Sequence, residues 1–144
     1  MKLLPLLPAG STYTGVDKGE ELLNEARKIF DASPYPHEFI CADLVNYTPK
    51  DKYDISICQA VLRHIPKSES ILQKMIDAVV PSGKVICIEV NRVMEEAGFY
   101  LHDSQYSEIE KIASLKDQWN KELNSTGRDY RMGIKTPILM QKWV

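Results

Sequence analysis

Thr12-Tyr13-Thr14-Gly15-Val16-Asp17 is the stretch that decides the fold. It predicts a short buried strand that ends in a carboxylate. Lys18 and Gly19 follow as a turn, and residues 20–30 then repeat apolar side chains at helical spacing. Strand, acidic tip, turn and helix form half of a nucleotide-binding βαβ unit, in which the acid accepts hydrogen bonds from ribose hydroxyls. The alternative is that Asp17 caps the helix, and the stretch alone does not decide between the two.

The composition indicates one globular domain with a small-molecule or protein partner. The 144 residues include 18 basic and 20 acidic side chains, which give a net charge of −2. The basic residues are scattered, so we expect neither nucleic acid nor a membrane surface as a partner. No run of the sequence approaches the ~20 apolar residues of a membrane span. Pro5 and Pro8 interrupt the apolar start, so we predict no signal peptide and a cytoplasmic protein.

Three cysteines, Cys41, Cys58 and Cys87, lie far apart inside apolar runs. Their number and spacing indicate neither a disulfide framework nor a zinc site, and we expect no bound metal. We predict that all three thiols are buried in neighbouring strands and unreactive, because a thiolate would be poorly solvated there.

Strands and helices alternate over residues 1–92. After the first strand and helix, strands are expected at residues 38–43, 54–59 and 84–91, with a helix over residues 68–80. The strands are apolar on both faces. This predicts an α/β fold with a mostly parallel sheet of about four strands and helices on both faces.

Residues 93–144 are expected to form a helical extension. A capping-box pattern at Ser107 predicts a helix that runs to about Leu123. Thr136 and Pro137 predict the start of a last helix, with Thr136 as its cap and Pro137 at its first position. The charged segment from Gly127 to Gly133 is interpreted either as a lid over a binding site or, more simply, as a solvated loop.

Three predicted strands end in polar residues, namely Asp17, Asp43 and Gln59. Ligands of an open α/β sheet bind beyond the carboxyl ends of its strands, so these tips predict a binding edge. Taken alone, Asp43 is also a common turn former. His64, in the loop after Gln59, is only a weak catalytic candidate, because a loop histidine is more often a partly exposed surface residue.

In order and spacing these segments resemble the class I S-adenosylmethionine-dependent methyltransferases, from about Leu3 to Asn91. Residues 13–17 are similar to the strand whose acid holds the cofactor ribose, and residues 41–44 to the corner that contacts the adenine. Residues 53–65 resemble the segment that faces the methionine moiety and the methyl acceptor. Residues 72–89, with Pro81-Ser82-Gly83-Lys84 inside them, resemble the family's helix, P-x-G turn and strand.

The resemblance implies a Rossmann-like three-layer sandwich that transfers a methyl group from S-adenosylmethionine to a small-molecule acceptor. It implies a partial core over residues 1–92 and an acceptor-side extension over residues 93–144. No catalytic residue is assigned beyond the weak candidate His64. The implied cofactor-binding residues are Asp17, Lys18, Asp43, Leu44, Gln59 and Ala60.

One feature of the family has no counterpart in the sequence. The glycine loop G-x-G-x-G is missing, because no two of the 7 glycines are two positions apart. We expect residues upstream of Met1 to supply this loop and the family's first strand, since residues 3–7 look like the stub of a helix. That strand lies between the counterparts of residues 13–16 and 55–58. We therefore expect two sheet halves, and these two segments are not expected to pair. A second copy of the chain could also supply a strand, which leaves a homo-oligomer open.

Two other functions stay open. A catalytically inactive relative would use the fold as an interaction module. A fragment of an NAD-binding oxidoreductase would use Asp17 for the ribose, although the adenine of NAD needs no acid at Asp43.

Overall fold

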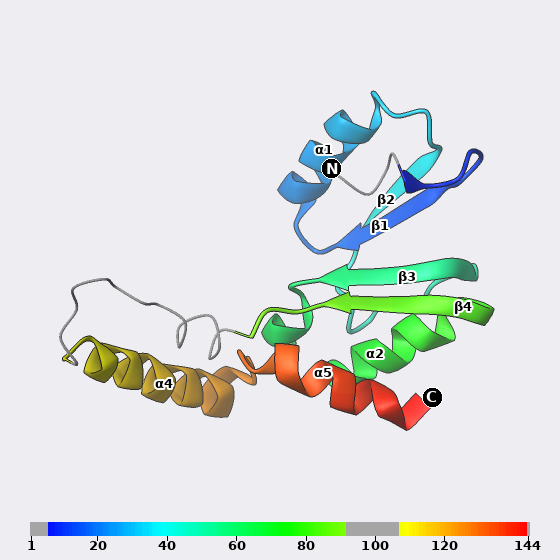
Figure 1. Ribbon diagram of the computed structural model, residues 1–144. Helices are drawn as coiled ribbons and strands as arrows, with labels where there is room; N and C mark the ends of the chain where they lie inside the picture. Colours follow the sequence, from blue (N-terminus) through cyan, green and yellow to red (C-terminus); the bar gives the residue numbers. More distant parts are fainter. Residues whose placement is uncertain (1–5, 92–106, 144) are drawn as a thin grey trace. The chain divides into compact units, whose positions relative to one another are not determined.

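The computed structural model describes residues 6–91 and 107–143, with side chains from residue 115 onward in the second range. The chain divides into two compact units, Met1–Thr48 and Pro49–Val144, which we call the first and the second unit and describe one at a time. Figure 1 labels their helices and strands.

The first unit holds two parallel strands joined by a helix, and its elements are β1 (Tyr13–Asp17), α1 (Glu20–Phe30) and β2 (His37–Cys41). α1 has acidic residues in its first turn and basic residues in its last turn, which suits the helix dipole. Fewer of its apolar side chains are buried than their helical spacing predicts. Leu23 and Phe30 are buried and Phe30 stacks on Tyr13, whereas Leu22 and Ile29 are 66% and 56% exposed.

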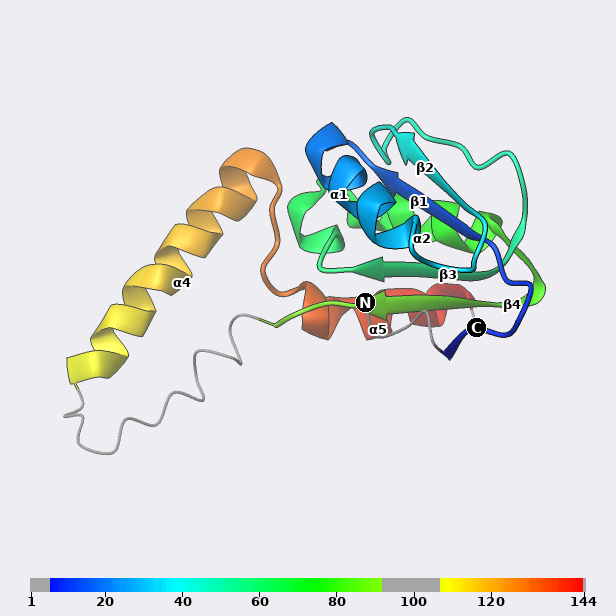
Figure 2. The ribbon, with the colours of Figure 1, turned by 90° about the horizontal axis from the view of Figure 1, so that it is seen from above.

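The second unit holds the other two strands, which also pair in parallel. Its elements are β3 (Tyr53–Gln59), η2 (Leu62–His64), α2 (Ser68–Asp77), β4 (Val79–Ile88), α4 (Ser107–Thr126), α5 (Met132–Met140) and η3 (Gln141–Trp143). Figures 1 and 2 both show α2 and α5 on the same face of the β3–β4 sheet. The core of this unit includes the buried side chains of Leu62, Ile71, Leu72, Met75 and Met132.

Within the second unit, one face of the β3–β4 sheet is well buried. Ile55 and Ile57 of β3 and Ile86 and Ile88 of β4 stand on the opposite face and are 38–51% exposed. The apolar strands therefore correctly indicate parallel pairing, but the helices of this unit cover a single face.

β4 begins earlier than predicted. α2 ends at Asp77, and Pro81-Ser82-Gly83 lies inside the strand instead of separating helix from strand. The register shifts there, because Tyr53 pairs with Val79 but Ile55 pairs with Lys84. Ser82 has a left-handed φ of 67°, and a Cβ atom on Gly83 would approach Val79 Cβ to 2.8 Å. These residues thus form a tight irregularity that only glycine permits at position 83.

The helix at Ser107 is confirmed, but the last helix starts before Thr136. α5 begins at Met132, so Thr136 is a buried interior residue and Pro137 lies inside the helix. The carbonyl of Arg131 accepts the N–H groups of Ile134 and Lys135, and the Asp129 carboxylate binds the Arg131 N–H and the Lys135 ammonium. These contacts form the first turn without the Thr-Pro signal.

The α/β class and the parallel strand pairing are confirmed. Within residues 6–91 and 107–143, β1 pairs with β2 and β3 pairs with β4, in two separate sheets. The expectation that β1 and β3 do not pair is therefore correct. No helix in the same ranges has the length and apolar run needed to cross a membrane.

Candidate functional site

The carboxyl edge of the β1–β2 sheet brings four of the six predicted cofactor residues together. β1 and β2 run in parallel register with Asp17 opposite Cys41, and the Ala42 N–H donates to the carbonyl of Asp17 at 2.9 Å. Lys18 follows Asp17, while Asp43 and Leu44 follow Ala42. The two acids therefore leave the sheet at one edge, as the strand tips predict.

Asp17 is not the N-cap of α1. Gly19 occupies the N-cap position, and no side chain caps the helix there. The Asp17 carboxylate instead accepts the Gly19 N–H through Oδ1 at 2.7 Å. A Cβ atom on Gly19 would lie 3.2 Å from this oxygen, so glycine leaves room for the carboxylate. This local bond positions the half-buried Asp17 and engages only one of its two oxygens.

Asp43 forms the turn after β2. Its Oδ1 atom accepts the Val45 N–H at 2.9 Å, and its carbonyl accepts the N–H groups of Asn46 and Tyr47 at 2.9 Å each. The turn-forming role is therefore real, and it holds the exposed carboxylate beside the strand tip. Leu44 lies within the same turn and is half-buried.

Cys41 lies at the same edge and is exposed, which corrects the prediction that all three thiols are buried. Its Sγ atom lies 3.7 Å from the carbonyl oxygen of Lys18. A hydrogen bond to Glu20 raises the pKa of Cys41. Cys58 is buried and Cys87 half-buried on neighbouring strands, and their mutual hydrogen bond, with burial, raises the pKa of Cys58.

Gln59 and Ala60 lie at the carboxyl edge of the β3–β4 sheet, in the second unit. Gln59 is the last residue of β3 and pairs with Ile88, and the Ala60 N–H donates to the Ile88 carbonyl at 2.8 Å. Ala60 has a φ of 55°, a left-handed conformation that is uncommon outside glycine.

Glu89 is the residue at this edge that sequence reasoning missed. It follows β4 directly, and its Oε1 atom accepts the N–H groups of Val61 and Leu62 at 2.8 Å each. The strand predicted over residues 84–91 hides this acid inside the strand. Since β4 ends at Ile88, the strand-tip rule that selects Asp17, Asp43 and Gln59 would also have selected Glu89.

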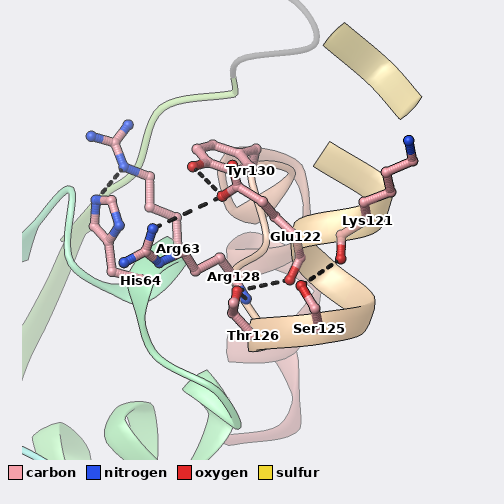
Figure 3. Close-up of polar contacts among 8 residues, drawn as sticks. All are labelled: Arg63, His64, Lys121, Glu122, Ser125, Thr126, Arg128 and Tyr130. Atoms are coloured by element: carbon pink, nitrogen blue, oxygen red, sulfur yellow. Dashed lines mark hydrogen bonds and ion pairs between the residues drawn. The ribbon is translucent and has the colours of Figure 1, made fainter. Parts of the chain in front are cut away.

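His64 lies exposed at the end of η2, and its Nε2 atom accepts a hydrogen bond from Arg63 Nε at 3.0 Å (Figure 3). This contact is between neighbouring surface residues and shows no catalytic arrangement. His64 stays a weak candidate.

The charged segment from Gly127 to Gly133 is attached to η2 instead of being free in solvent. The Asp129 N–H donates to the carbonyl of Arg63 at 2.9 Å, and Asp129 and Tyr130 are half-buried. Figure 3 shows Tyr130 and Arg128 directed toward Glu122 of α4, with a hydrogen bond of 2.8 Å from Tyr130 and an ion pair of 4.0 Å from Arg128. The hydrogen bond to Glu122 raises the pKa of Tyr130.

A model of a known protein family matches most of the chain. Residues 3–131 fit a family model described as "Methyltransferase domain". Among curated proteins, the chain is 33% identical over 89 residues to a "Ubiquinone biosynthesis O-methyltransferase" of Hydrogenovibrio crunogenus, covering 60% of this chain and 37% of that protein. The protein of the same name from Shewanella halifaxensis is 30% identical over 93 residues, covering 58% and 36%. The chain spans little more than a third of the length of these relatives.

Among solved structures, the chain is similar to the plantazolicin methyltransferase BpumL in complex with SAH. The TM-score is 0.54 at 23% identity, covering 67% of this chain and 35% of that one. A complex of the same enzyme with a triazolic desmethylPZN analog and SAH gives a TM-score of 0.53 with the same coverage. This likeness shows the fold alone, which is Rossmann-like.

Proposed function

The chain belongs to the methyltransferase-domain family, as its resemblance predicts, and we propose that it binds S-adenosylmethionine for methyl transfer to a small-molecule acceptor. The observation that carries this proposal is the pair of acids, Asp17 and Asp43, at one sheet edge inside the matched residues. Because the chain spans about a third of its relatives' length, its activity and its acceptor are both part of the proposal. A cytoplasmic location and a homo-oligomer stay predictions from the sequence.

Asp17 is proposed to bind the cofactor ribose. An ionised carboxylate is an acceptor with about four lone-pair sites, so the bond to Gly19 leaves capacity for a diol that donates twice. The half-buried position of Asp17 favours charge-assisted hydrogen bonds, which are shorter and stronger than neutral ones. Lys18 is proposed to flank the same moiety.

Asp43 and Leu44 are proposed to contact the adenine. The bond from the Val45 N–H fixes the Asp43 carboxylate at the same edge as Asp17, where it can accept a hydrogen bond from an exocyclic amine. An acid at each of the two strand tips favours S-adenosylmethionine over NAD, because the adenine of NAD needs no acid at the second tip.

Gln59 and Ala60 are proposed to face the methionine moiety. Gln59 is exposed and can both donate to a carboxylate and accept from an ammonium group. The sulfonium of the bound cofactor supplies both the methyl group and the leaving group. The residues then contribute mainly by alignment, which is worth about 7–11 kcal/mol at best, so the proposal needs no general base. The extension over residues 93–144 is proposed to lie on the acceptor side.

Calorimetric titration of the chain with S-adenosylhomocysteine (SAH), and separately with NAD, tests the proposal. We expect SAH to bind and NAD to give no heat. Asp17→Ala should weaken SAH binding about 10- to 100-fold, the usual effect of losing charge-assisted hydrogen bonds. Glu38→Ala is the matched control, because Glu38 is exposed and is the second residue of β2, near the amino end and away from the carboxyl edge.

Each outcome of the titration decides between the functions. Binding of NAD without SAH would favour the oxidoreductase. Binding of neither ligand would overturn the cofactor proposal and favour an interaction module. SAH binding that Asp17→Ala leaves unchanged would remove Asp17 from the site.

A further inference from the structure

We propose that Glu89 is a positioning residue, which holds the backbone after β3 in the conformation that places Gln59 and Ala60. This inference takes from the proposed function only the identity of the ligand that Gln59 and Ala60 contact. The contacts of Glu89 lie within the second unit and do not depend on the proposed function.

The end of β4 holds three successive N–H groups of the segment that follows β3. The Ile88 carbonyl accepts from Ala60, and Glu89 Oε1 accepts from Val61 and Leu62, each at 2.8 Å. Successive N–H groups directed at one atom form a concave site for an anion. Glu89 supplies that anion from within the chain, so these N–H groups do not serve a phosphate or carboxylate of a ligand.

The backbone held in this way is unfavourable at Ala60. Its φ of 55° lies in the left-handed region, which persists for a residue with a side chain only where the surroundings determine it. On the other side of the turn, the side chain of Leu62 is 0% exposed and anchors η2 in the core. The turn between Gln59 and Leu62 is thus fixed by Ile88 at the end of β4, by Glu89 directly after it, and by the burial of Leu62.

Stability alone does not account for a carboxylate at this position. Glu89 Oε2 is buried and has no hydrogen-bond partner within residues 6–91 and 107–143. A buried acceptor that lacks a donor destabilises the fold. The unpaired Oε2 therefore offsets part of the stability that the two hydrogen bonds of Oε1 contribute. The two bonds of Oε1 have a clear structural effect, which is the geometry of the turn.

Amide hydrogen exchange of the chain tests the role of Glu89. In Glu89→Ala we expect Val61 and Leu62 to exchange about 10- to 100-fold faster relative to Ile57 of β3, because their acceptor is lost. Glu89→Gln should restore most of the protection, since an amide oxygen also accepts N–H groups. Lys84→Ala, at an exposed position of β4, is the control and should leave both amides unchanged.

Titration with SAH completes the test. Glu89→Ala should bind SAH at least about tenfold more weakly. Glu89→Gln should recover the affinity, because the turn requires a hydrogen-bond acceptor at this position but does not require a negative charge. Unchanged exchange of Val61 and Leu62 in Glu89→Ala would overturn the inference, and so would lost protection with unchanged SAH affinity. If Glu89→Ala does not fold, loss of protection in Glu89→Gln overturns it equally. Failure of the unmodified chain to bind SAH would refute the proposed function, while the exchange rates would still test Glu89.

Discussion

At the scale of single residues, the location of the site residues at strand tips was easier to predict than the hydrogen bonds that their side chains form. Asp17 and Asp43 were found because polar residues after apolar strands mark a sheet edge. The bond of Asp43 to Val45 agrees with the turn-forming alternative that its residue type offered. The bond of Asp17 to Gly19 replaces the helix cap that was the alternative for this residue. Glu89 was missed because the end of its strand was misplaced, and that end is set by pairing with β3.

The exposure of Cys41 gives a prediction at the residue scale. A thiol reagent should label Cys41 in the native chain before Cys58, which is buried. Because the hydrogen bond to Glu20 raises the pKa of Cys41, the thiolate fraction is small near neutral pH. The labelling rate should therefore still rise steeply at about pH 9, where an ordinary cysteine approaches its plateau. Mass spectrometry of the labelled peptides measures each rate.

The variant Glu20→Gln tests whether the hydrogen bond to Glu20 is what raises the pKa of Cys41. Removing the carboxylate should lower the pKa of Cys41 toward its ordinary value, so labelling at about pH 8 should become faster. Glu21→Gln removes a carboxylate at the next position of α1 and should leave the rate unchanged. Two results would contradict this explanation. One is an equal labelling rate of Cys41 in the unmodified chain, Glu20→Gln and Glu21→Gln, and the other is labelling of Cys58 as fast as that of Cys41.

At the scale of elements, prediction succeeded where local signals decide the structure. α1 has the predicted bounds, since periodicity, charge placement and the preceding glycine all agree. Prediction failed where tertiary contacts override the local signal. α5 starts early because Asp129 and Arg131 organise its first turn, and β4 starts early because Val79 pairs with Tyr53 before the Pro-Ser-Gly irregularity.

The approach of α5 to the segment that follows β4 gives a prediction at the element scale. A Cβ atom on Gly133 would lie 2.7 Å from the backbone nitrogen of Asn91. Gly133 is the second residue of α5, and replacing a helical glycine by alanine usually stabilises the helix by up to about 1 kcal/mol. Here we expect the opposite sign, a loss of about 1–3 kcal/mol in the free energy of unfolding, because backbone atoms cannot move aside.

Urea unfolding of Gly133→Ala measures this change. Ile138→Ala is the control on the same helix, because Ile138 is 61% exposed and its truncation should alter stability by less than about 0.5 kcal/mol. A more stable Gly133→Ala chain would show that α5 does not approach Asn91 as described.

At the scale of the whole molecule, the fold class, the order of elements and the break between the two strand pairs were predictable, the last of these only from the family resemblance. Alternating apolar strands and helices indicate parallel pairing, which both sheets show. Which strands pair with one another depends on every strand of the sheet and is not encoded in any single segment. Propensity alone therefore suggested one sheet, and only the family resemblance indicated that β1 and β3 would not pair.

The central proposal is that the carboxyl edge of the β1–β2 sheet, with Asp17 and Asp43, binds the adenosine part of S-adenosylmethionine. The most direct test is titration of the isotopically labelled chain with SAH, followed by the backbone amide signals in two-dimensional NMR. The account predicts the largest shifts at Asp17 to Gly19, at Asp43 and Leu44, and at Gln59 and Ala60. Signals at the amino ends of the strands, such as Tyr13, His37 and Tyr53, should stay in place. No shifts at saturating SAH, or shifts confined to the amino ends, would contradict the account.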